Sequence, residues 1–76
     1  MNETTDRDET LASAGPGEFV CSRLKADGEN AVRLKRLGIC EGRTLEVVTA
    51  GNPMVLFVAG ARIGLSRQLA ELVIVK

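Results

Sequence analysis

The chain has 76 residues, a formal net charge of zero and a mean hydropathy of +0.07, which together indicate one small globular domain. A chain of this length buries only about 60% of the surface that its unfolded form exposes, so its core is small. No apolar run approaches the roughly 20 residues that cross a bilayer, and the N-terminus lacks the basic start and apolar stretch of a secretory signal. These features argue against membrane-spanning and secreted classes, and we expect a cytoplasmic protein.

Charged residues are divided unevenly along the chain. Residues 1–18 carry five acidic residues and one arginine, a net charge of −4, whereas residues 19–76 carry nine Lys or Arg and five acidic residues, a net charge of +4. The first 16 residues are mostly polar and show no periodicity, and they end in a Gly-Pro-Gly sequence at residues 15–17. We therefore predict a disordered acidic leader over residues 1–16 and a folded domain over residues 17–76. The leader either keeps the protein soluble or folds back over the basic body and competes with a partner.

Cys21 and Cys40 are the only cysteines, and the chain has no histidine. Without a secretory signal a structural disulfide is not expected, and a closed zinc site usually takes four Cys or His ligands. We expect both thiols to be small apolar fillers, with a metal or redox role between two molecules as the alternative. Among the carboxylates of the domain, Asp27 and Glu29 lie close together, but Asp27 is more simply a helix N-cap. We predict no cofactor and no resident metal.

The first regular element is a predicted strand over residues 19–24, which has apolar residues on both faces. A helix over residues 29–37 follows, because apolar residues recur there at helical spacing. Its apolar stripe consists of Ala31, Leu34 and Leu37. Gly38 then ends the helix as a left-handed residue, which allows Ile39 to pack back on Leu34 in a Schellman motif.

Short strands and turns occupy the rest of the chain. In order they are a turn at residues 41–42, a strand over 43–48, a loop over 50–53, a strand over 54–59, a turn at 60–61, a strand over 62–65, a one-turn helix from Ser66 through Leu69 and a strand over 72–75. We assign structural roles in these turns to Gly42, Pro53 and Gly60. About five strands, one short helix after the first strand and a one-turn helix before the last predict a mainly β fold, a small SH3-like barrel. An OB-fold, whose strands are usually longer, is the alternative.

The order of these motifs resembles a known family. The sequence RLKRLGI at residues 33–39 is followed by Glu41 and Gly42, and this is similar to a short helix, an LG-hydrophobic stop and a glycine turn into a strand. Further matching positions are Gly51-Asn52-Pro53, Gly60, Ile63, Leu65, Ser66-Arg67, Ala70-Glu71, Val73 and Val75. Together they resemble the ferrous iron transport protein A (FeoA) family over residues 17–76. Glu41 stands where the family often has proline, Asn52 replaces a common aspartate, and the acidic leader is not a family feature.

The resemblance implies an SH3-like barrel that works as a cytosolic accessory to a membrane ferrous iron permease, ferrous iron transport protein B (FeoB). That partner carries a GTP-binding domain, and the accessory is expected to modulate it by protein contact. The domain also resembles the C-terminal modules of metal-dependent repressors of the diphtheria-toxin-repressor type.

The side chains also favour binding to another protein over catalysis. The chain has no histidine, tyrosine or tryptophan and no glycine-rich loop with phosphate-binding spacing, so we do not expect an enzyme. The 54–58 segment has apolar residues on both faces, and only one of these faces can fill the core. The other apolar face must be covered by the helix, by the last strand or by a partner. We place the partner contact on Phe57 and the adjoining helix end. The predicted contact residues are Arg33, Arg36, Leu37, Phe57 and Arg67.

Two alternatives of other classes stay open. A self-associating module, a homo-oligomer, would be recognised by size-exclusion chromatography at several concentrations. A nucleic-acid-binding barrel would show steep salt dependence, although Phe19 and Phe57 are the only aromatic residues available for base stacking.

Overall fold

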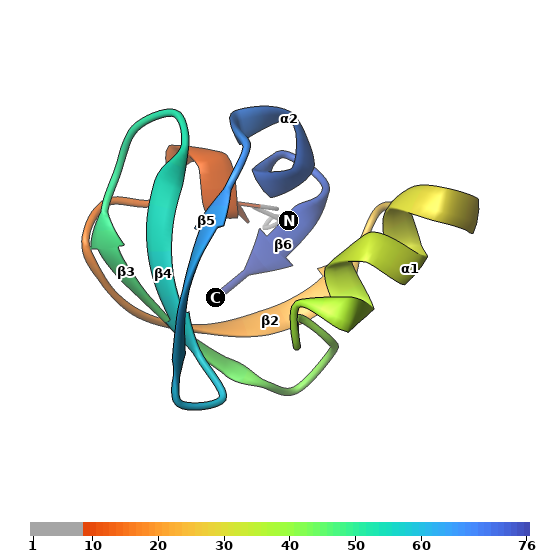
Figure 1. The fold of residues 1–76 in the computed structure, drawn as a ribbon, viewed down its shortest axis with the longest axis horizontal. Coiled ribbons are helices and arrows are strands. Elements are labelled where there is room, and N and C mark those ends of the chain that lie inside the picture. Colours follow the sequence, from red (N-terminus) through yellow and green to blue (C-terminus); the bar gives the residue numbers. More distant parts are fainter. Residues whose placement is uncertain (1–8) are drawn as a thin grey trace, which may run out of the picture.

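The computed structural model describes residues 9–76, which form a curled antiparallel sheet with two small α-helices (Figure 1). The elements in chain order are β1 (Glu9–Thr10), the 3-10 helix η1 (Leu11–Ser13), β2 (Gly17–Leu24), α1 (Gly28–Arg36), β3 (Thr44–Thr49), β4 (Met54–Val58), β5 (Ala61–Leu65), α2 (Arg67–Ala70) and β6 (Val73–Val75). Every strand and helix predicted from the sequence is present, with ends that differ by one or two residues. The structure adds β1 and η1.

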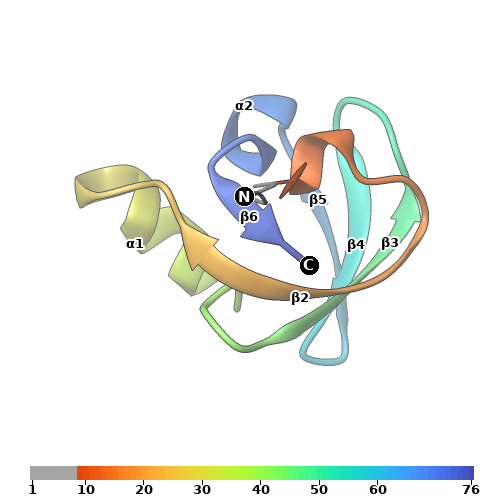
Figure 2. The ribbon, with the colours of Figure 1, turned by 180° about the vertical axis from the view of Figure 1, so that it is seen from behind.

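The six strands form one sheet in the order β1-β6-β2-β3-β4-β5. The long strand β2 connects the two halves, because its first residues pair with β3 and its last residues pair with β6. Figures 1 and 2 show β2 running along the length of the molecule, from the side of β3 to the start of α1. Among residues 9–76, the end strands β1 and β5 pair with one neighbour each, so the barrel is nearly closed and not fully closed.

Alternate side chains of β4 point into the core. Met54, Leu56 and Val58 are buried, whereas Phe57 points to the other face and is exposed. Strand β6 has apolar residues on both of its faces, as β4 does. Val73, Ile74 and Val75 are all buried, because β6 lies between β1 and β2 and η1 packs into the same core.

The end of α1 is fixed by backbone hydrogen bonds. The N–H of Ile39 donates to the carbonyl of Leu34 at 3.0 Å, and the N–H of Gly38 donates to the carbonyl of Lys35 at 2.9 Å. With Gly38 at φ +92°, these two bonds make the predicted Schellman motif. Asp27 occupies the N-cap position but makes no side-chain capping bond. The helix is therefore held at its C-terminal end, close to β4.

Capping side chains also fix α2. The Ser66 hydroxyl accepts a hydrogen bond from the N–H of Leu69 at 3.2 Å, as the sequence predicts. The side-chain amide oxygen of Asn52, Oδ1, accepts another from the N–H of Arg67 at 3.1 Å. The loop between β3 and β4 is thereby tied to the first turn of α2.

The predicted domain boundary at residue 17 is too late in the chain. Leu11 and Ala14 are buried in the main core cluster, and Glu9 and Thr10 pair with Val75 and Ile74 of β6. A polar composition and a Gly-Pro-Gly sequence suggested a leader, but two apolar side chains are enough to bind this segment to the barrel. The remaining part of the predicted leader, residues 1–8, lies outside the described residues.

Within residues 9–76, no helix has the length and apolar character that a membrane crossing requires.

Candidate partner-binding surfaces

The outer face of α1 combines an exposed apolar side chain with basic ones. Val32 is 49% exposed, more than any other large apolar side chain among the described residues. Lys35 and Arg36 follow it by three and four positions, so these two cations can border it on the same side of the helix, and Arg33 is the next residue along the chain. We call Val32, Arg33, Lys35 and Arg36 the helix surface. Its cations lie in the last turn of α1, where the helix dipole favours positive charge.

Leu37 does not belong to this exposed surface, although the sequence predicted it as the apolar anchor. It is the C-cap residue, is only partly exposed and packs against the core. Val32 takes its place as the exposed apolar residue. The signal in the sequence was that Val32 falls outside the apolar stripe of Ala31, Leu34 and Leu37, so it had to point away from the core.

A second exposed cluster lies on the outer face of the sheet. Phe57 on β4 is paired with Glu46 on β3 and with Arg62 on β5, so the three residues form a row across the strands. The Arg62 guanidinium carbon lies 5.7 Å from the centre of the Phe57 ring, a cation–π contact. Val48, at the bulge in β3, is also exposed. We call Glu46, Val48, Phe57 and Arg62 the sheet surface.

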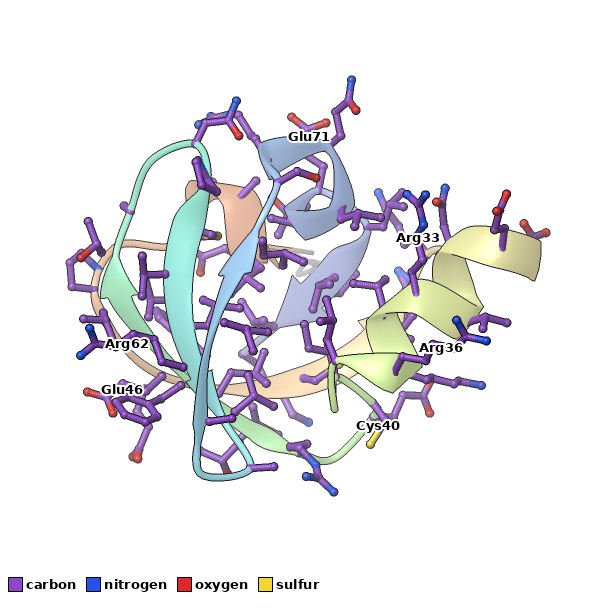
Figure 3. The ribbon with its side chains drawn as sticks, viewed as in Figure 1. Arg33, Arg36, Cys40, Glu46, Arg62 and Glu71 are labelled. Atoms are coloured by element: carbon purple, nitrogen blue, oxygen red, sulfur yellow. The ribbon has the colours of Figure 1, made fainter. Side chains whose placement is uncertain are left out.

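The two surfaces are separate, so Phe57 does not adjoin the helix end, as the predicted contact assumed. Figure 3 places Arg33 and Arg36 at one end of the long axis and Glu46 and Arg62 at the other. The helix end does lie against β4, because a Cβ on Gly38 would be 3.2 Å from Val58. Alternation along the strand then sends the next side chain, Phe57, to the opposite face.

The other predicted residues lie at the start of α2 and in turns. Arg67 begins α2 and is exposed, and Figure 1 places α2 at the end of β5 away from the turn between β4 and β5. Gly42 and Gly60 have positive φ values of +87° and +82°, and Pro53 directly precedes β4. These residues shape the loops and do not extend either surface.

The two cysteines lie on neighbouring backbone segments. Arg43 donates its N–H to the carbonyl of Cys40 and accepts a hydrogen bond from the N–H of Cys21. Cys21 is buried and Cys40 is partly exposed, and both are free thiols. Burial raises the pKa of the Cys21 thiol, and the nearby Cys40 and Glu41 add to the rise. Cys21 is therefore held as a neutral thiol, which suits an apolar filler and not a nucleophile.

This raised pKa predicts a pH dependence of stability. An unfolded chain loses a cysteine proton near the ordinary pKa of about 8.5. The folded state keeps the Cys21 proton to higher pH, because the pKa of that thiol is raised. Above that pH the free energy of unfolding should fall, by up to about 1.4 kcal/mol per pH unit. Denaturant titrations between about pH 7 and 10 should show the fall in the parent and in Cys40→Ala. In Cys21→Ala it should be reduced, and an unchanged slope there would contradict the assignment.

No group of three or more Cys, Asp or Glu side chains in the described part of the chain is arranged to hold a metal ion.

Known proteins give the chain a family context. The FeoA domain model matches residues 9–76, a range that includes β1 and η1. No curated protein matches the chain. A crystal structure of an iron uptake regulatory protein (FeoA) superposes with a TM-score of 0.83 at 25% identity, covering 88% of this chain and 92% of that one. FeoA from Stenotrophomonas maltophilia, a zinc complex described as an SH3 domain protein, superposes with a TM-score of 0.76 at 25% identity, covering 90% and 89%.

The fold also occurs inside a larger regulator. The manganese regulator SloR superposes with a TM-score of 0.78 at 11% identity, over 88% of this chain but only 33% of SloR. At this identity the similarity concerns the fold alone. The SH3-like architecture, the match to residues 9–76 and the two FeoA structures agree, and the chain belongs to the FeoA domain family.

Proposed function

We propose that this chain is a cytosolic accessory protein that binds the cytosolic region of a FeoB-type ferrous iron permease through the helix surface and modulates it. The family links the chain to ferrous iron transport, and the S. maltophilia relative is described as a suggested ferrous iron transport activating factor. The single observation that carries the choice of surface is the exposed Val32 beside the cations of the last turn of α1.

The chemistry of the helix surface defines the partner that it fits. Val32 offers a small apolar contact, and Arg33, Lys35 and Arg36 give the same part of α1 a positive charge. Arginine is enriched among residues that dominate binding energy, and charges at the edge of an interface speed association. We expect the permease to present an acidic patch around a shallow apolar depression.

The anchoring of α1 supports this role. The Schellman bonds fix the helix end, and Leu34 and Leu37 attach the inner face of α1 to the core. The side chains of the helix surface are thus presented from a backbone that is already ordered. Binding therefore does not have to order the helix backbone, and the affinity is not reduced by that entropy cost.

Matched charge reversals test the surface. Arg36→Glu should weaken binding to the purified cytosolic region of the permease by about ten-fold, and the double variant with Arg33→Glu should weaken it further. Arg62→Glu makes the same change of charge on the sheet surface, at the other end of the molecule. It should bind like the parent, and so should Phe57→Ala. Isothermal titration calorimetry at two salt concentrations measures the affinities.

The apolar part of the surface has its own variant. Val32→Asp places a carboxylate where the side chain is already half exposed, so the fold should be retained. The acidic partner patch should repel it. If the helix variants bind like the parent while Arg62→Glu or Phe57→Ala loses affinity, the contact belongs to the sheet surface and the proposal is wrong.

A further inference from the structure

Strand β5 is an unpaired edge of the sheet. All five of its residues, Ala61 to Leu65, are paired with β4 without a bulge, and no strand in the described part of the chain pairs with its other side. At the opposite end of the sheet, the edge strand β1 has only two residues. Natural edge strands are usually protected by shortness, proline, bulges or charged side chains, and of these devices β5 has only the charge of Arg62.

The turn before β5 determines which of its backbone groups are free. Ala59 and Gly60 form a two-residue turn with φ values of +52° and +82°. Such a turn closes on a hydrogen-bonded pair, here Val58 with Ala61, and the pattern then alternates along the strands. The N–H and C=O groups of Arg62 and Gly64 therefore point away from β4. No backbone hydrogen bond to these groups is found within residues 9–76.

Neither the backbone conformation nor the packing of the chain requires a glycine at position 64. Its φ lies outside the left-handed region, and an added Cβ would meet nothing nearer than the Pro53 side chain at 3.9 Å, an ordinary contact. A glycine inside a strand costs about 0.5–1 kcal/mol relative to alanine. In strands, such a glycine often marks a place where another backbone approaches closely.

We propose that the β5 edge pairs with β5 of a second copy of this chain, antiparallel, with the two-fold axis at Ile63. In this register Arg62 of each copy lies opposite Gly64 of the other, and the outward groups of these residues form the hydrogen bonds. The continuous sheet then runs β4-β5-β5-β4 across the two copies.

This arrangement is self-complementary in three respects. Each Arg62 faces a residue without a side chain and not another cation, and it can keep its contact with Phe57. The two Ile63 side chains, each partly exposed in the single chain, meet at the axis as a non-hydrogen-bonded pair, where side chains are closest. The free donors and acceptors of one edge match those of its copy. These features favour a second copy over an unrelated strand.

Five residues make a small interface, well below the about 1,000 Å² that stable complexes bury, so the dimer is weak. Sedimentation velocity from about 10 µM to about 1 mM should show the parent moving from monomer to dimer. Amide NMR shifts of Arg62, Ile63 and Gly64 should change over the same range. A parent that stays monomeric throughout overturns the proposal, even if another protein later proves to occupy the edge.

Variants at one position separate pairing from folding. Gly64→Pro removes an outward N–H that makes no bond to β4, so the monomer should keep its fold and the dimer should be lost. Gly64→Glu and Gly64→Lys differ in the sign of the charge set opposite Arg62 of the second copy. The first should raise the association constant by about five-fold and the second should lower it by about five-fold, since the pair occurs twice. Equal association of these two variants, or a Gly64→Pro dimer as strong as the parent's, would overturn the register. Because none of these changes touches the helix surface, failure here leaves the proposed function intact.

Discussion

Replacing Leu11 with alanine is expected to lower the free energy of unfolding by about 3 kcal/mol. Leu11 is fully buried in the core cluster, although it lies in a segment that the sequence pattern assigned to a leader. A domain of this length has a total stability of roughly 4–11 kcal/mol, so the loss is a large fraction. Urea denaturation followed by circular dichroism measures the change. Val32→Ala, at an exposed position, is the matched control and should change stability by less than about 0.5 kcal/mol.

Two truncations extend this test to the whole segment. A chain that begins at Glu9 should unfold with nearly the parent's midpoint, because every described element is retained. A chain that begins at Gly17 loses β1, η1 and the buried Leu11 and Ala14, and it should be unfolded or marginal at 25 °C. Equal stability of the two chains would show that residues 9–16 do not belong to the domain.

Replacing Gly38 with alanine should destabilise the domain by about 2–4 kcal/mol. Gly38 has φ +92°, which disfavours any residue with a Cβ, and the new Cβ would lie 3.2 Å from Cγ1 of the buried Val58. Gly28→Ala is the matched control, because Gly28 also has a positive φ, +60°, but no atom lies within 4 Å of its added Cβ. Gly28→Ala should lower the free energy of unfolding only by the strain of a positive φ in a residue with a Cβ, about 1 kcal/mol.

A double-mutant cycle isolates the contact between Gly38 and Val58. Val58→Ala removes the methyl groups that the new Cβ would meet, so Gly38→Ala should cost less in that background, by about 1 kcal/mol. Thermal unfolding should show the difference between the Gly38 and Gly28 variants as several degrees in Tm. Equal costs for Gly38→Ala and Gly28→Ala would mean that the helix end does not press on β4.

Most of the fold was predictable because its signals are local. The stripe of Ala31, Leu34 and Leu37 followed by Gly38 fixed the helix and its end, and the turn residues separated the strands. The segment at residues 9–16 was not predictable in this way. Its burial depends on pairing between Thr10 and Ile74, which are distant in the sequence, and Leu11 alone gives no periodic pattern.

The candidate site was only partly predictable, for a similar reason. The sequence identified the arginines of α1, and the alternation along β4 identified Phe57 as a side chain outside the core. These side chains are all exposed in the structure. It could not show that the outer face of β4 and the outer face of α1 point to opposite ends of the molecule, because that depends on how the sheet curls. Contact between Phe57 and Arg62 likewise depends on strand register across the turn at Ala59 and Gly60.

The separation of the helix surface from the β5 edge has a functional consequence. A permease bound at α1 would leave the sheet surface and β5 uncovered, so a weak dimer could form while the partner is bound.

NMR mapping of the bound surface tests the central claim most directly. The ¹⁵N-labelled chain is titrated with the unlabelled cytosolic region of the permease, and amide shifts are followed for every residue of the domain. The account predicts that the largest changes fall on Val32, Arg33, Lys35 and Arg36, while Glu46 and Phe57 stay unchanged. Changes confined to β3, β4 and β5, with α1 unaffected, would contradict it.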